Sequence, residues 1–232
     1  MKTKSLNLTG IAAGLVLSAA LASAQTESNF TFTVNQAVPV ANANGLMTVG
    51  SVAQMPAAIS DVTVSLDLAG GFNGNLYAYL TGPNGGFAVL LNRVGVSNSA
   101  SAFGYSDAGF NITLSDTAAN GDIHYYQNTL NPGGAQLTGT WMPDGRNIDP
   151  MSSPSAFLTA SQSALLSSFD GTNPNGTWTL FVADLAAGSQ PTLVNWGLDI
   201  TTVPEPAYWS IGLLGALLLT LTTLKRRRVT QS

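Results

Sequence analysis

The chain holds few of the side chains that usually carry catalysis. It has one histidine, His124, and no cysteine, which excludes disulfides, thiolate metal sites and a cysteine nucleophile. A serine–histidine–aspartate triad would need His124 as its base. This residue lies outside every strand-like segment, and no Gly-x-Ser-x-Gly turn occurs. We therefore expect His124 to be a solvated loop residue and the protein not to be an enzyme.

Oxygen ligands offer a second kind of chemistry. Asp144, Asn147 and Asp149 lie within a six-residue run, and hard cations favour such clusters of oxygen-bearing side chains. The run lacks the spacing of an EF-hand and its terminal glutamate. The alternative is a polar turn in which these side chains bond their own backbone. Calcium at this run is the one cofactor that the sequence suggests.

Two tyrosines suggest a surface for sugars. Tyr77 and Tyr79 share one face of a predicted strand, opposite Leu76 and Leu80. Rings two residues apart on a strand are about 7 Å apart and can stack on a glycan. The alternative is that these rings lie under a loop and cover the protein's own core.

The charges are separated along the chain. Six of the eight basic residues lie at the two ends, so Arg93 and Arg146 are the only cations between residues 25 and 206. All twelve acidic residues lie in that segment, which gives it ten net negative charges. Because nucleic-acid binding needs Lys and Arg to neutralise phosphates, we expect no nucleic-acid partner.

The N-terminus has the order of a secretory signal peptide. Lys2 and Lys4 precede an apolar run at 11–21, and small residues follow. Ala22 and Ala24 occupy the two specificity positions, which predicts cleavage before Gln25 and a signal helix over residues 1–24. An uncleaved anchor is the alternative, but the apolar run is short for a membrane span.

The C-terminus has the order of a membrane span. Residues 207–224 carry no charge and, as a helix, would extend ~27 Å, enough to cross a thin bilayer. The basic cluster 225–228 follows at once, and the positive-inside rule keeps such a cluster in the cytoplasm. The sequence therefore predicts one transmembrane helix, with the body outside.

The tetrapeptide Val203-Pro204-Glu205-Pro206 stands directly before this span. Its prolines prevent helix and strand continuation, so we expect an extended segment suited to a protease cleft. With the span and basic cluster, residues 203–232 resemble the PEP-CTERM family of sorting signals. The resemblance implies cleavage by an exosortase in a Gram-negative bacterium that makes exopolysaccharide. The protein would be anchored in the inner membrane and then delivered to the envelope or extracellular matrix. The alternative is a plain anchor.

The body has the pattern of an all-β protein. Apolar and polar residues alternate in four runs separated by Gly- and Pro-rich turns, which predicts strands with one buried face: 62–68, 76–80, 177–182 and 194–200. We expect one antiparallel β-sandwich over residues 25–202, with Trp178 and Trp196 in its core. Residues 158–168 could form a short helix, and 120–154 are expected to be irregular loops.

Three blocks of the body resemble the P-domain of proprotein convertases. They are 62–91, 109–118 and 166–200, and the last, with Gly176-Thr177-Trp178 and Trp196-Gly197-Leu198, is the most specific. The resemblance covers most of 55–201 and implies a jelly-roll sandwich. Asn75 stands where the family often has Asp, which puts in doubt a calcium site that some relatives have there.

These features together predict a non-enzymatic surface or matrix protein that is sorted by an exosortase and linked to exopolysaccharide. Two alternatives stay open. The sandwich could be a carbohydrate- or calcium-binding module with a definite ligand. It could also be an accessory domain of a hydrolase, although no protease domain accompanies it in this chain.

Overall fold

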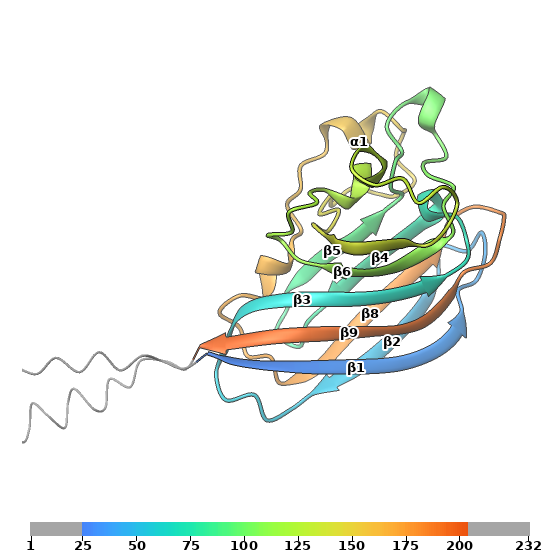
Figure 1. The fold of residues 1–232 in the computed structure, drawn as a ribbon. Coiled ribbons are helices and arrows are strands. Elements are labelled where there is room, and N and C mark those ends of the chain that lie inside the picture. Colours follow the sequence, from blue (N-terminus) through green and yellow to red (C-terminus); the bar gives the residue numbers. More distant parts are fainter. Residues whose placement is uncertain (1–24, 204–232) are drawn as a thin grey trace, which may run out of the picture.

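The computed structural model describes residues 25–203, which fold into two β-sheets packed face to face (Figure 1). Helical segments are short, and strands account for most of the regular secondary structure. The predicted all-β sandwich is confirmed. Its strands are β1 (Thr26–Ala37), β2 (Leu46–Val52), β3 (Ala58–Ala69), β4 (Leu76–Thr81), β5 (Phe87–Asn92), β6 (Gly109–Leu114), β7 (Leu137–Trp141), β8 (Gly176–Asp184) and β9 (Thr192–Val203).

One sheet has the order β1-β9-β3-β6-β7, and the other has the order β2-β8-β4-β5. Every pair of neighbouring strands is antiparallel except β6 and β7, which run parallel with Phe110 opposite Leu137. The expectation of a wholly antiparallel sandwich was therefore wrong at this edge. A parallel pair needs a long crossover, and residues 115–136 supply it.

The core lies between the sheets and is built by strand alternation. All four predicted alternating runs fall within strands, namely β3, β4, β8 and β9. Trp178 and Trp196 are fully buried, as predicted, and so is Trp141 of β7. The ring of Phe32 on β1 packs 4.5 Å from that of Trp196, measured between centroids. Removing these large apolar surfaces from water is the main term that stabilises such a domain.

The helical segments are η1 (Asn73–Asn75), η2 (Ser99–Ser101), η3 (Ile123–Asn128), α1 (Ala156–Thr159) and η4 (Leu166–Phe169). The helix expected over 158–168 is instead two single turns, α1 and η4. Between them, Gln162 forms an isolated bridge with Arg146, which holds the backbone extended. The expectation of loops over 120–154 was partly wrong, because the region contains η3 and β7.

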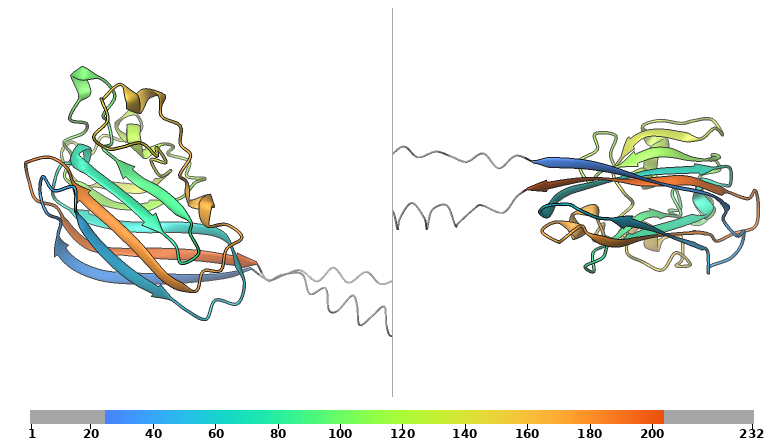
Figure 2. Two further views of the ribbon diagram at one scale, coloured as in Figure 1. Left: turned by 180° about the vertical axis from the view of Figure 1, so that it is seen from behind. Right: turned by 90° about the horizontal axis from the view of Figure 1, so that it is seen from below.

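The loops and short helices gather on one side of the sandwich. They lie over the side that carries β5 and β7 and leave the side of β1 and β2 largely uncovered (Figure 1). β1 begins and β9 ends at the same end of the domain (Figure 2). The chain therefore enters and leaves the described fold side by side.

Candidate functional site

The predicted processing sites flank two strands that are hydrogen-bonded neighbours. β1 and β9 are antiparallel, with Thr26 opposite Thr202. Gln25, the expected first residue of the exported protein, is exposed. Val203, the first residue of the predicted sorting motif, is half-buried in β9 opposite Ala58. Strand β9 thus includes the first residue of the predicted motif.

The other residues of the two signals lie outside the described residues. These are Ala22, Ala24, Pro204, Glu205, Pro206, the predicted span 207–224 and the basic cluster 225–228. Among residues 25–203, no helix combines the length and apolar character that a membrane crossing requires.

The expectation that His124 is a solvated loop residue was wrong, because its side chain is completely buried. Asp122 caps η3 by accepting the backbone N–H of His124, which turns the imidazole inward. Its Nδ1 lies 2.7 Å from Oδ2 of Asp144, and its Nε2 lies 2.8 Å from the carbonyl oxygen of Val96. Both ring nitrogens therefore face acceptors within the protein, and neither faces a serine hydroxyl.

The two arginines of the described residues are also bound internally. Arg146 contacts Asp122 at 2.7 Å and Asp144 at 3.3 Å. Burial alone would lower the pKa of Arg146, but the hydrogen bond to Asp122 and the two carboxylate charges raise it above its ordinary value. Arg93 donates to the carbonyl oxygens of Gly74, Pro150 and Ala102, and burial lowers its pKa. Both side chains therefore link loops to one another through hydrogen bonds, and Arg146 also through ion pairs.

The three residues suggested for calcium have different surroundings. Asp144 is completely buried and its oxygens accept from His124 and Arg146, whereas Asn147 and Asp149 are exposed. Oδ1 of Asp149 accepts the backbone N–H of Met151, which is the bonding of a polar turn. Within residues 25–203, no group of three or more acidic or histidine side chains is placed to hold a metal ion.

Tyr77 and Tyr79 lie on the outer face of β4, as the alternation predicts, and both are half-buried. The ring of Tyr79 stacks on Phe181 of β8 at 4.8 Å, and the two tyrosine rings are 5.9 Å apart. Burial raises the pKa of Tyr77, with further contributions from Tyr79 and from Asp149 and Asp144 in the nearby loop. Much of their aromatic surface is therefore used within the protein.

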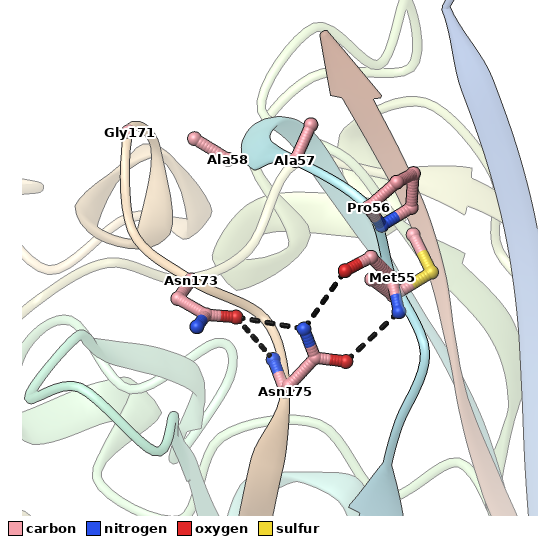
Figure 3. Close-up of a pocket in the computed structure, with 7 residues that line it drawn as sticks. All are labelled: Met55, Pro56, Ala57, Ala58, Gly171, Asn173 and Asn175. Carbon is pink, nitrogen blue, oxygen red and sulfur yellow. Dashed lines mark hydrogen bonds between the residues drawn. The ribbon is translucent and has the colours of Figure 1, made fainter. Parts of the chain in front are cut away.

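A polar pocket of about 280 Å³ lies where the segment between β2 and β3 meets the segment before β8 (Figure 3). The side-chain amide of Asn175 holds Met55 by accepting its N–H and donating to its carbonyl oxygen, both at 2.9 Å. It also donates to Asn173. The hydrogen bonds of this amide therefore hold the segment between β2 and β3 against the segment before β8. The lining side chains include no acid or base.

A larger and more apolar pocket, of about 470 Å³, is lined chiefly by Phe72, Phe103, Tyr105, Ala186 and Ala187, with Asn75 as a polar member. Near it, Asp184 is completely buried and its Oδ2 has no partner. Burial raises the pKa of Asp184, although the N–H of Ala186 and the amide of Asn75 oppose that shift. The backbone N–H of Ala186 donates to Oδ1 of Asp184 at 3.3 Å.

The outer face of the five-stranded sheet is polar and acidic. Asp199 of β9 lies diagonally between Glu27 of β1 and Asp61 of β3, since Thr201 is the direct partner of both. Burial raises the pKa of Asp199, and so do the neighbouring carboxyl groups of Glu27 and Asp61. Its Oδ1 has no hydrogen-bond partner. Three carboxyl groups therefore lie close together here. Arg93 and Arg146, the two arginines of the described residues, bind other groups.

The sequence interpretation missed both the His124–Asp144 pair and this acidic group. The acidic group could have been predicted from the sequence. Asp199 occupies a polar position of the run 194–200, and Asp61 directly precedes the run 62–68, so both side chains must face outward. The histidine pair could not have been predicted, because its partners Asp144 and Val96 are 20 and 28 residues away along the chain.

No family model matches this chain, and no curated protein matches it. Among solved structures, it is similar to the serine protease of Aeromonas sobria in complex with its chaperone, with 16% identity over 78% of this chain and a TM-score of 0.45. The same protease solved without the chaperone gives 16% identity over 77% of this chain and a TM-score of 0.44. The matches cover 28% and 27% of those chains, so this protein spans about a quarter of their length.

Proposed function

We propose that this protein is an exported, non-enzymatic surface protein that an exosortase releases from the inner membrane into the envelope or the extracellular polysaccharide. The observation that carries the proposal is the order of parts at the C-terminus. A Pro-Glu-Pro motif, a charge-free stretch of membrane length and a basic cluster follow one another without a gap, and residues 1–24 have the pattern of a signal peptide. Each part is common alone, and the combination is specific to sorting signals.

The end of the domain supports this proposal. β9 continues to Val203, which is the last residue that the structure describes and directly precedes Pro204 in the sequence. A cut within 203–206 would then free a complete sandwich and leave almost no tail on it. Cutting further toward the N-terminus would remove residues of β9, the strand that joins β1 to β3.

We assign the sandwich a structural or adhesive role, and on the three sequence blocks we assign it to the P-domain type of jelly roll. The arrangement around His124 agrees with a non-catalytic role. Its two ring nitrogens bond Asp144 and Val96, so they hold loops together and have no free position for a substrate.

The second candidate is a glycan-binding module, and the face around Asp199 favours it. Its crowded carboxyl groups would be relieved by a positive partner, so the glycan would carry free amines, as a partly deacetylated amino-sugar polymer does. Retention of the exported protein on such a polymer, but not on its fully acetylated form, would support this candidate. Equal retention on both would contradict it.

The experiment for the main proposal compares hosts with and without an exosortase. Both express the full chain, and blots follow the protein in membrane and released fractions. The proposal predicts a shorter, released form in the first host and a longer, membrane-bound form in the second. Equal release in both hosts would show that an exosortase is not required.

A further inference from the structure

The sandwich has four strands at sheet edges, and two of them, β5 and β7, are bonded to other segments along those edges. A free edge presents unpaired N–H and C=O groups, so proteins usually interrupt or cover it. At β5, the N–H of Val89 donates to Ala164 and its carbonyl oxygen accepts from Gly145, each at 2.9 Å. The loops on that side of the sandwich therefore cover β5.

The edges of the five-stranded sheet are also interrupted. On β7, the carbonyl oxygens of Thr138 and Thr140 accept from the side chains of Trp141 and Asn120, both at 2.9 Å. On β1, the register shifts between Thr33 and Gln36, where Asn35 has a φ of 51°. The bulge disturbs the ladder at that end of β1 only. Residues 26–33 keep a regular register with β9, but their exposed side chains are polar and include the charge of Glu27.

β2 has none of these protections. Its residues 46–52 pair in regular register with β8, and among residues 25–203 they make no recorded hydrogen bond to any other segment. The strand contains no proline and no charge, and no charged residue occurs between Glu27 and Asp61. Met47 and Val49 point away from the core and are 61% and 65% exposed.

We infer that β2 is a pairing surface for a second copy of this chain, through antiparallel contact between the two β2 strands. Such a contact is isologous, because each strand offers the other the same edge. With a two-fold axis at Thr48, Met47 of each copy lies opposite Val49 of the other copy, which gives two equivalent pairs. The four exposed apolar side chains would then cover one another on the outer face of a continuous eight-stranded sheet.

Charge favours a second copy at this edge over contact elsewhere. The described residues are strongly acidic, so two copies repel each other over most orientations. Residues 28–60, which include β2 and most of β1, carry no charge, and they lie on the side that the loops leave largely uncovered (Figure 1). This inference does not depend on how the chain is sorted.

The absence of cysteine from the sequence gives a direct test. Val49→Cys and, as a matched control on another edge strand, Thr138→Cys are each made in the full chain and treated in the exporting cell with a bis-maleimide. The crosslinker should span ~8 Å, the separation of diagonal neighbours across an antiparallel pair. Both parent residues are exposed, so both variants should fold.

The inference predicts a species of twice the mass for Val49→Cys and its near absence for Thr138→Cys. It also predicts that Met47→Cys is crosslinked and that adding Val49→Lys to that chain abolishes the product, because the two lysines would be diagonal neighbours of like charge across the pair. Equal crosslinking at positions 49 and 138, or none at position 49, would overturn the inference.

Discussion

Thr26 and Thr202 are direct partners in the ladder between β1 and β9, so the first and last strands of the domain are neighbours. The two predicted cleavages would therefore fall beside each other at one end of the sandwich. Because β9 lies between β1 and β3, the C-terminal strand is fully integrated in its sheet. Release of the domain by a cut after β9 would leave that integration intact.

The two buried tryptophans are expected to respond differently to loss of the indole N–H. Trp178 Nε1 donates to the carbonyl oxygen of Pro174 at 2.9 Å, whereas Trp196 Nε1 has no partner. Trp178→Phe should cost about 1–3 kcal/mol more than Trp196→Phe, because it leaves a buried acceptor unpaired. Each change to alanine should cost ~3–5 kcal/mol. Denaturant unfolding measures all four values, and a costlier Trp196→Phe would refute the reasoning.

His124→Ala should destabilise the protein, although His124 lies in the segment that connects β6 to β7 and not in a strand. The change removes the 2.7 Å contact to Asp144 and leaves a fully buried carboxyl group with one partner fewer. Leaving a buried carboxyl group short of a hydrogen-bond partner costs about 1–3 kcal/mol. The free energy of unfolding would be compared with that of Thr117→Ala, an exposed loop residue. A loss no larger than in this control would mean that His124 is dispensable to the fold.

The sequence predicted the sandwich because burial in a strand repeats every two residues, and the runs in β3, β4, β8 and β9 keep that period. The same period is visible in β1, where Phe30, Phe32 and Val34 alternate with threonines, and it was overlooked. β7 could not be found in this way, because Leu137–Trp141 is short, contains a glycine and pairs in parallel. The pair of His124 and Asp144 depends on loops meeting in space, which local patterns do not encode.

Asp199→Asn should stabilise the protein near neutral pH. The pKa of Asp199 is raised in the fold by burial, by Glu27 and by Asp61. A raised carboxyl pKa means that its favourable contribution is present below the unfolded value and is lost as the pH rises through the folded value. The variant should therefore have a higher melting temperature than the wild type at neutral pH. The gain should shrink below the ordinary carboxyl pKa of about 4.

Asp67→Asn is the matched control for this prediction, because Oδ1 of Asp67 accepts from Gln136 at 3.0 Å and so has a favourable partner. This variant should not raise the melting temperature at neutral pH. If Asp199→Asn lowers the melting temperature there, the crowding of carboxyl groups on this face is not destabilising.

The exported protein should begin at Gln25. Small side chains at positions 22 and 24 are what signal peptidase requires, and Gln25 is exposed immediately before β1. Mass spectrometry of the protein from the envelope fraction should find Gln25 as the N-terminus. Ala24→Leu should leave residues 1–24 attached, whereas Thr26→Ala should be processed normally. A mature protein that retains Met1 would contradict the prediction.

The central claim is that Pro204, Glu205 and Pro206 direct release of the sandwich from the membrane. The direct measurement replaces all three with alanine in the full chain and compares membrane and released fractions in a host with its exosortase. Thr222→Ala and Thr223→Ala in the predicted span serve as the control. The account predicts that the alanine variant of the motif stays uncut in the inner membrane while the control is released. Release of the motif variant as efficiently as the wild type would contradict the account.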